Sequence, residues 1–172
     1  KDWHEPHLVF TLDGGGDDAC AHVYLAQHGG LRLLAATPTG HSLGNIYASV
    51  TYMLGMRPHE HEYKVMGLAP YADAEQAQLL AQAFARYLDL DPGNLLRFRR
   101  TIPERTSSIL PRLLQDFRMV RFDLVAAALQ LFTEDLVRRW IAAAVAQTGV
   151  RNVLAAGGVF MNVKMNLRLA DL

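Results

Sequence analysis

The chain has 172 residues, of which 51% are hydrophobic and 20% charged, and its 17 basic and 17 acidic side chains give a formal net charge of zero. This length predicts one domain with a substantial core. The balanced charge argues against a nucleic-acid or membrane-surface partner, and no run reaches the roughly 18–20 apolar residues of a membrane span. A single cysteine, Cys20, excludes an internal disulfide, favours a core position, and indicates a reducing, cytoplasmic location.

The first third of the chain predicts a three-stranded antiparallel meander. Residues 8–13, 19–27 and 31–37 are β-rich runs, linked by residues 14–17 and by His28-Gly29-Gly30. Ser42 is expected to cap a helix that continues to Leu54 and stops at Gly55. A loop rich in histidine and glutamate follows, at residues 59–62.

The middle of the chain gives a weaker pattern. Asp73 is expected to cap an alanine-rich helix over residues 74–88, whereas residues 89–109 lack clear periodicity and predict a surface excursion. We therefore expect a helical and loop insertion at about residues 73–120 within a single partial domain.

The last third predicts a helix, a strand and a helix. Asp123 is expected to cap the longest helix, which ends at Gly149, and its buried stripe comprises Val125, Leu129, Phe132, Leu136 and Trp140. A short strand over residues 152–156, a Gly157-Gly158 turn and a helix from Val159 complete the order. Hairpins followed by a strand–turn–helix unit predict an α/β fold with a mixed sheet flanked by helices.

The first candidate site is Thr11-Leu12-Asp13-Gly14-Gly15-Gly16-Asp17. A carboxylate at a strand end, followed by three residues without Cβ, would let backbone N–H groups approach phosphate oxygens while Asp13 holds a metal or orients water. A plain hairpin turn explains the same residues, and the motif alone leaves both interpretations open.

The second candidate site surrounds Gly157 and Gly158, where an apolar strand leads into a helix start that favours anions. Asn162 and Asn166 are four residues apart, so both amides are expected on one helix face, where they can read polar nucleotide atoms. Many folds that bind no nucleotide share such a turn. Four further polar residues, His4, His7, His59 and His61, are interpreted as solvated rather than as metal ligands.

Three segments together carry a family resemblance: the Asp13–Asp17 turn, His61-Glu62-Tyr63-Lys64-Val65-Met66-Gly67-Leu68-Ala69-Pro70-Tyr71, and Gly157-Gly158-Val159-Phe160-Met161-Asn162-Val163-Lys164-Met165-Asn166. The chain resembles the O-carbamoyltransferase family of the NodU/CmcH type. That resemblance implies a ribonuclease-H-like lobe of the actin/sugar-kinase/Hsp70 superfamily. It also implies formation of carbamoyl-adenylate from carbamoyl phosphate and ATP, and carbamoyl transfer to a hydroxyl of a sugar or natural product.

The resemblance also implies roles for individual residues. Asp13 would be the catalytic carboxylate and a metal ligand, Gly14, Gly15, Gly16 and Asp17 the phosphate turn, and Glu62 the acid that binds ribose hydroxyls. Gly157, Gly158, Asn162 and Asn166 would form the adenosine-binding turn, and Lys64 would neutralise phosphate or carbamoyl oxygens or serve structure alone. The implied cofactors are ATP, Mg²⁺ and an iron-like divalent metal.

The sequence departs from the family pattern, and these departures predict an incomplete active site. Paired metal-binding histidines are missing before Asp13, a later metal-ligating Asp would follow Leu172, and Ala72 replaces a common glycine. We therefore expect one lobe of a longer enzyme that is inactive alone. Alternatives are a non-catalytic nucleotide-binding module and a tRNA-carbamoylating or sugar-kinase relative, and self-association into a dimer is left open.

Overall fold

The computed structural model describes residues 5–170, and the predicted meander is present. It consists of β1 (His7–Gly16), β2 (Ala19–Gln27) and β3 (Gly30–Pro38), which pair antiparallel in chain order. Gly14, Gly15 and Gly16 extend β1 rather than forming the link, which is a correction to the prediction. The turn lies one step later, at Asp17 and Asp18, whose φ angles of 47° and 65° are left-handed values that aspartate tolerates.

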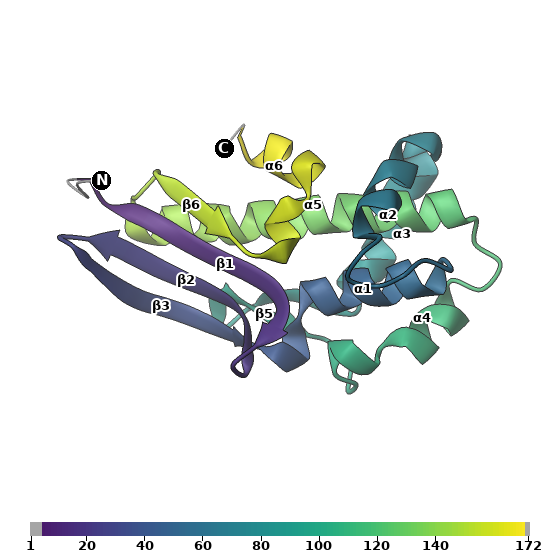
Figure 1. Ribbon diagram of the computed structural model, residues 1–172, viewed down its shortest axis with the longest axis horizontal. Coiled ribbons are helices and arrows are strands. Elements are labelled where there is room, and N and C mark those ends of the chain that lie inside the picture. The colour runs from purple at the N-terminus through teal and green to yellow at the C-terminus, as the bar shows by residue number, and fades with distance from the viewer. Residues whose placement is uncertain (1–4, 171–172) are drawn as a thin grey trace.

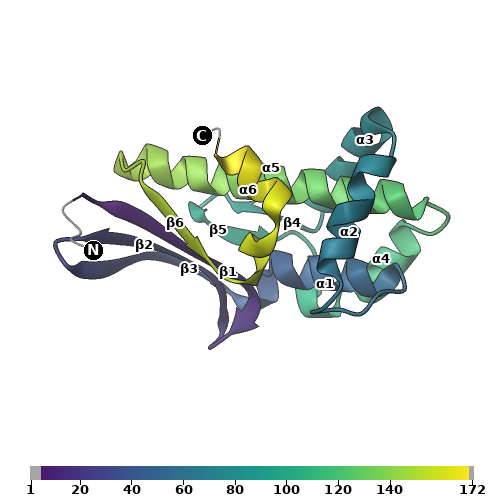
Figure 2. The same ribbon diagram turned by 45° about the horizontal axis from the view of Figure 1, so that its top comes forward.

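A fourth strand, β6 (Val153–Ala156), pairs parallel with β1, so the sheet order is β3-β2-β1-β6 (Figures 1 and 2). The α/β class, the mixed sheet and the antiparallel meander are thereby confirmed. The narrower ribonuclease-H-like assignment stays a prediction.

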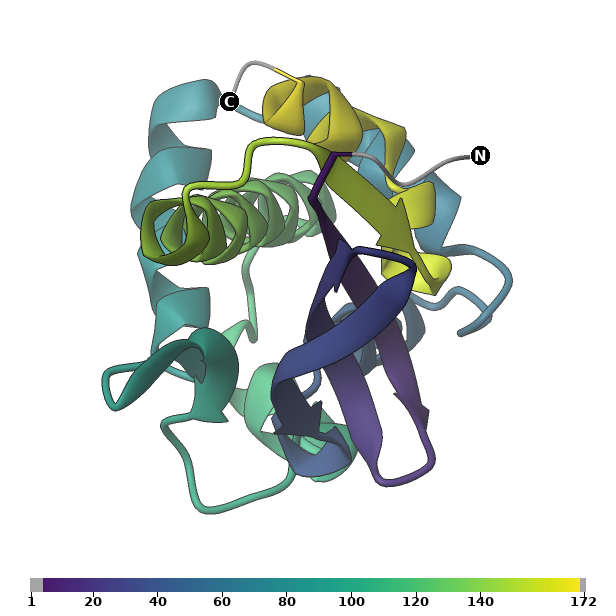
Figure 3. The ribbon, with the colours of Figure 1, turned by 90° about the vertical axis from the view of Figure 1, so that its left-hand side faces the viewer.

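The core lies between the sheet and the longest helix, α5 (Phe122–Thr148). Alternate residues of β1, namely Leu8, Phe10 and Leu12, are fully buried, as expected of a strand with one covered face. The ring of Phe10 meets that of Trp140 edge-on at 4.8 Å. Figure 3, in which α5 is seen nearly end-on, places the helix to one side of β1–β3.

The helices between β3 and the middle of the chain are short. They are η1 (Thr39–His41), α1 (Leu43–Met53), α2 (Glu62–Leu68), η2 (Ala69–Tyr71) and α3 (Ala74–Ala85). The predicted caps of α1 and α3 are confirmed, because Ser42 Oγ accepts the N–H of Asn45 and Asp73 Oδ1 accepts that of Gln76. α3 is shorter than predicted, since Leu88 already belongs to a strand.

Residues 89–109 are not the surface excursion that their weak periodicity predicted. β4 (Leu88–Asp91) and β5 (Asn94–Arg100) form a hairpin, followed by η3 (Thr106–Ser108) and α4 (Leu110–Asp116). Leu96 and Phe98 are each 2% exposed, and the ring of Phe98 lies 4.8 Å from that of Trp140. The N–H of Phe98 also donates to Thr37 Oγ1 in β3, so the hairpin belongs to the core.

Two helix starts differ from the prediction. Arg121, not Asp123, is the N-cap of α5, and the Asp123 carboxylate binds Arg121 and the N–H of Leu124 from within the first turn. The predicted buried stripe of α5 and the end of this helix at Gly149 are confirmed. After β6 the chain forms η4 (Gly158–Met161), breaks at Asn162 and restarts as α6 (Val163–Leu169).

Among residues 5–170, no helix is both long and apolar enough to cross a membrane.

Candidate functional site

The two glycine motifs meet at Asp13. The N–H of Gly158 donates to Asp13 Oδ1 at 2.5 Å, which joins the end of β1 to the turn after β6. Gly157 has a φ of 108°, and a Cβ there would overlap the carbonyl oxygen of Leu12 and lie 2.8 Å from Asp13 Oδ2. Only glycine allows this approach, so the turn keeps one Asp13 oxygen bonded and places the other beside Gly157.

The start of α1 supports the same strand end. Ser42 Oγ donates to the carbonyl oxygen of Asp13 at 3.2 Å while it caps α1. A Cβ on Gly44 would lie 2.9 Å from the backbone of Gly14, so the helix packs directly on the glycine strand because Gly44 lacks a side chain. Asp13 is therefore held from two sides, its side chain by the turn after β6 and its backbone by the start of α1.

A polar cavity of about 640 Å³ opens on one side of Asp13. We call it the glycine cavity. Its lining comes from the β1–β2 strand ends, η1, α1 and the loops around residues 59 and 105, and comprises Thr11, Asp13, Gly14, Gly15, Gly16, Asp17, Ala19, Cys20, His22, Thr39, Gly40, Asn45, His59, Arg105 and Ser107. The predicted phosphate turn, from Asp13 to Asp17, thus lies in one cavity.

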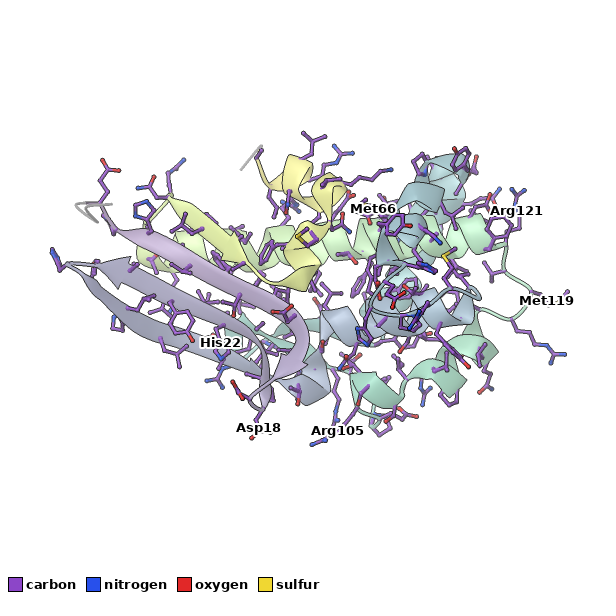
Figure 4. The ribbon with its side chains drawn as sticks, viewed as in Figure 1. Asp18, His22, Met66, Arg105, Met119 and Arg121 are labelled. Atoms are coloured by element: carbon purple, nitrogen blue, oxygen red, sulfur yellow. The ribbon has the colours of Figure 1, made fainter. Side chains whose placement is uncertain are left out.

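A second cavity of about 580 Å³ shares Asp13, Gly14 and His59 with the first, and we call it the aromatic cavity. Its remaining lining combines apolar and aromatic side chains with two acids: Gly44, Tyr47, Ala48, Glu60, Glu62, Tyr63, Met66, Gly158, Val159, Met161 and Asn162. Figure 4 shows Met66 on α2 and Arg105 below it at the lower edge of the molecule. Asp13 therefore stands at the boundary between a polar and a largely apolar space.

His59 is a candidate that sequence reasoning interpreted as solvated, and it lines both cavities. Its φ of 67° is left-handed, and its N–H donates to Glu62 Oε1 at 2.6 Å. Glu62 therefore holds the His59 loop at the cavities as well as lining one of them. His61 stabilises the same loop, because its Nδ1 accepts the N–H of Arg57. Of the two remaining histidines, His7 bonds to the carbonyl oxygen of Glu5, and His4 lies outside the described residues.

The two asparagines do not share one helix face as predicted, because Asn162 is the N-cap of α6 and only Asn166 lies within it. The Asn162 amide pairs in both directions with that of Gln130, at 2.9 and 3.0 Å, and its oxygen also accepts the N–H of Met165. Asn166 Nδ2 donates to the carbonyl of Phe160. Both side chains therefore bind the protein itself, although Asn162 also borders the aromatic cavity.

Lys64 lies apart from the other candidates. It is exposed on α2, its Nζ stands 5.8 Å from the centre of the Tyr63 ring, and it lines neither cavity. This placement agrees with the structural alternative that the sequence left open.

The acids at the glycine cavity suit a hard cation. Mg²⁺ binds through one or two carboxylates plus substrate phosphates and water, and Asp13 and Asp17 offer carboxylates on one cavity wall. The implied iron-like metal has no comparable ligand set, because no group of three histidine, cysteine or acidic side chains gathers within the described part of the chain.

Cys20 borders the glycine cavity but is 3% exposed, as its core assignment predicted. Burial raises the pKa of its thiol to about 12, so the thiol stays protonated at neutral pH. Burial likewise raises the pKa of Tyr47, whose hydroxyl donates to Gln130 Oε1 at 3.2 Å. Burial therefore disfavours the ionised, nucleophilic form of both groups at neutral pH.

The fold and the candidate site define an α/β protein with two adjoining cavities at the end of its sheet. A family model described as carbamoyltransferase N-terminus matches residues 3–171, and the chain belongs to this family.

Three relatives illustrate the match. The nodulation protein NolNO of Sinorhizobium fredii is 34% identical over 96% of this chain and 24% of its own length. The nodulation protein NolO of Bradyrhizobium diazoefficiens is 32% identical over 96% of the chain and 30% of its own. The uncharacterized protein MJ1051 of Methanocaldococcus jannaschii is 27% identical over 95% of this chain and 32% of its own length. The chain thus spans a third or less of each of these relatives.

Proposed function

We propose that this chain is the nucleotide-binding part of a longer ATP-dependent O-carbamoyltransferase. The observation that carries the proposal is the position of Asp13, whose carboxylate joins the glycine end of β1 to the turn after β6 at the boundary of a polar and an apolar cavity. A nucleotide has the same division, since its phosphates need N–H donors and a cation while its base needs apolar surface.

In this proposal the base and ribose occupy the aromatic cavity, with Tyr63 and Met66 as apolar walls and Glu62 as an acceptor for ribose hydroxyls. The phosphates occupy the glycine cavity beside Gly14–Gly16. Mg²⁺, held by Asp13 with Asp17 nearby, would supply charge neutralisation at the phosphates. Asn162 supports the wall of the aromatic cavity through Gln130 rather than reading the base.

The proposed chemistry has three steps. Water cleaves carbamoyl phosphate to carbamate and inorganic phosphate. A carbamate oxygen then attacks the α-phosphorus of ATP, the bond to the β-phosphate oxygen breaks, and pyrophosphate leaves. Finally an acceptor hydroxyl on a sugar or natural product attacks the carbamoyl carbon, loses its proton, and AMP leaves.

The test is nucleotide product analysis on the full-length protein with ATP and Mg²⁺, with and without carbamoyl phosphate. AMP and pyrophosphate that appear only with carbamoyl phosphate support the proposal. ADP with a phosphorylated sugar would indicate a kinase, and ATP binding without turnover would indicate a non-catalytic nucleotide-binding module.

Asp13→Asn sharpens this test. The amide oxygen can still accept the Gly158 N–H, so the junction is preserved while the charge is lost. We expect AMP formation to fall about 10²- to 10³-fold, the range for loss of one electrostatic group in an active site. Asp18→Asn is the matched control, because Asp18 lies on the β1–β2 turn that follows the glycine segment, borders neither cavity and has a φ that asparagine accepts. Equal rates in both variants would remove Asp13 from the mechanism.

A further inference from the structure

Part of the wall of the glycine cavity is built by a segment that carried no motif. Arg105 and Ser107, on either side of η3's first residue, line the cavity together with Thr39 and Gly40 of η1. The sequence placed Arg105 and Ser107 in the predicted surface excursion at residues 89–109. Figure 4 shows Arg105 at the lower edge of the molecule, near the end of the sheet where Asp18 marks the β1–β2 turn.

The segment is fixed to the same support as Asp13. Thr106, between the two lining residues, is fully buried, and its Oγ1 accepts the N–H of Ser42 at 2.9 Å. Ser42 in turn donates through its Oγ to the carbonyl of Asp13. One serine therefore connects the Arg105 segment and the Asp13 strand end, through one buried and one partly buried hydrogen bond.

The charge of Arg105 is not used within the described chain. Several other arginines are paired there, for example Arg112 with Glu104 at 2.7 Å and Arg139 with Asp89 at 2.8 Å. Arg105, in contrast, has no ion pair or side-chain hydrogen bond to any of residues 5–170, although two carboxylates, Asp13 and Asp17, line the same cavity.

The Arg105 side chain packs beside Gly40. A Cβ at Gly40 would lie 3.6 Å from Arg105 Cγ and 3.7 Å from its Nε, and Arg100 Nη1 stands 3.7 Å from the same point. Two guanidinium groups therefore flank one backbone position. Their positive charge lies beside η1, whose Thr39 and Gly40 line the glycine cavity together with Arg105.

We propose that Arg105 binds the negatively charged oxygens of a phosphate or pyrophosphate group seated between it and Gly14–Gly16. A guanidinium fork matches two phosphate oxygens, and such charge-assisted bonds are stronger than neutral ones. Ser107 provides a further hydroxyl on the same wall. This inference rests on the proposed function in identifying the group as the β- and γ-phosphates of ATP, and a separate inorganic anion has the same chemistry.

The test compares Arg105→Gln with wild type in the full-length protein, using calorimetric titration with ATP, AMP and inorganic pyrophosphate in the presence of Mg²⁺. We expect ATP affinity to fall about 10- to 100-fold, the equivalent of one charge-assisted hydrogen-bonded group, and AMP affinity to change less than about twofold. Arg97→Gln is the control, because Arg97 is an exposed arginine of β5 that borders neither cavity. Matching thermal unfolding curves would show that both variants fold.

The outcomes separate this inference from the proposed function. Wild-type ATP binding that Arg105→Gln leaves unchanged, or an equal loss of ATP and AMP affinity, would overturn the Arg105 assignment alone. If wild type binds no ATP, the proposed function fails, and pyrophosphate binding then decides the Arg105 inference. Pyrophosphate binding lost in Arg105→Gln would support an anion site independent of nucleotide, whereas no pyrophosphate binding by wild type would overturn it.

Discussion

Two glycine segments look alike in the sequence: one ends β1 and leads into the β1–β2 turn, and the other forms the turn after β6. They differ in where their polar groups point. Around the first segment, the acids Asp13 and Asp17 line the glycine cavity. Around the second, Asn162 and Asn166 bind Gln130 and the Phe160 carbonyl, so their amides hold the turn in place. The comparison teaches that one glycine segment can line a cavity while another supports the fold, and that the hydrogen-bond partners of nearby polar side chains distinguish the two.

The difference follows from position in the sheet. The first segment ends β1, between α1 on one side and β6 on the other, where strand ends leave space for two cavities. The second connects β6 to α6, and η4 folds back so that Phe160 is 7% exposed in the core. A turn that anchors a buried ring needs internal partners for its polar groups.

The largest expected effect tests the supporting role of the second turn. Gly157→Ala should lower the free energy of unfolding by roughly 3 kcal/mol, because Ala is strained at a φ of 108° and its Cβ would overlap the Leu12 carbonyl. Gly67→Ala is the control, since it lies in α2 with no atom within 4 Å of the added Cβ, and it should be neutral or stabilise by up to about 1 kcal/mol. Urea unfolding measures both, and equal stability of the two variants would contradict the account.

A smaller effect is expected at the amide pair. Asn162→Ala removes the α6 cap and two bonds to Gln130, and should cost about 2 kcal/mol of unfolding free energy. A double-mutant cycle with Gln130→Ala should show a coupling of about 1 kcal/mol. Asn166→Ala, which loses one bond, should cost about 1 kcal/mol. An Asn162→Ala variant with unchanged stability but weakened ATP binding would place this residue with the ligand-facing group instead.

The smallest effect concerns η1, which borders the glycine cavity and is joined to β5 through His41. Burial, and then the charge of Arg100, lower the pKa of His41 from its ordinary value of 6.5, and its Nδ1 accepts the N–H of Arg100 at 2.8 Å. The folded state therefore favours neutral imidazole. Its contribution to stability is complete above pH 6.5 and declines as the pH falls below that value.

Urea midpoints at pH 7.5 and 5.5 measure this dependence, with His41→Gln as the comparison because an amide oxygen can also accept the Arg100 N–H. We expect wild type to lose more stability than His41→Gln on acidification. Identical losses in the two proteins would exclude His41 as the titrating group.

Local patterns in the sequence predicted most of the elements. Ser42 and Asp73 were recognisable caps because each accepts an N–H three residues away. Gly149 was a recognisable end of α5 because the backbone there is left-handed, a conformation that glycine adopts readily. The buried stripe of α5 was equally visible, since the helical period places its members on one face. Such features depend on neighbours within one or two turns.

The tertiary structure decided what depends on distant partners. The hairpin at residues 88–100 was missed because its core position depends on Trp140 and Thr37 rather than on its own short alternation. The Asn162 partner, Gln130, lies on another helix, and the Asp13–Gly158 bond spans 145 positions. Arg105 and His59 belong to no recognisable motif, and only folding brings them to the glycine cavity. The free energy that fixes their positions comes from burial and hydrogen bonds made by other parts of the chain.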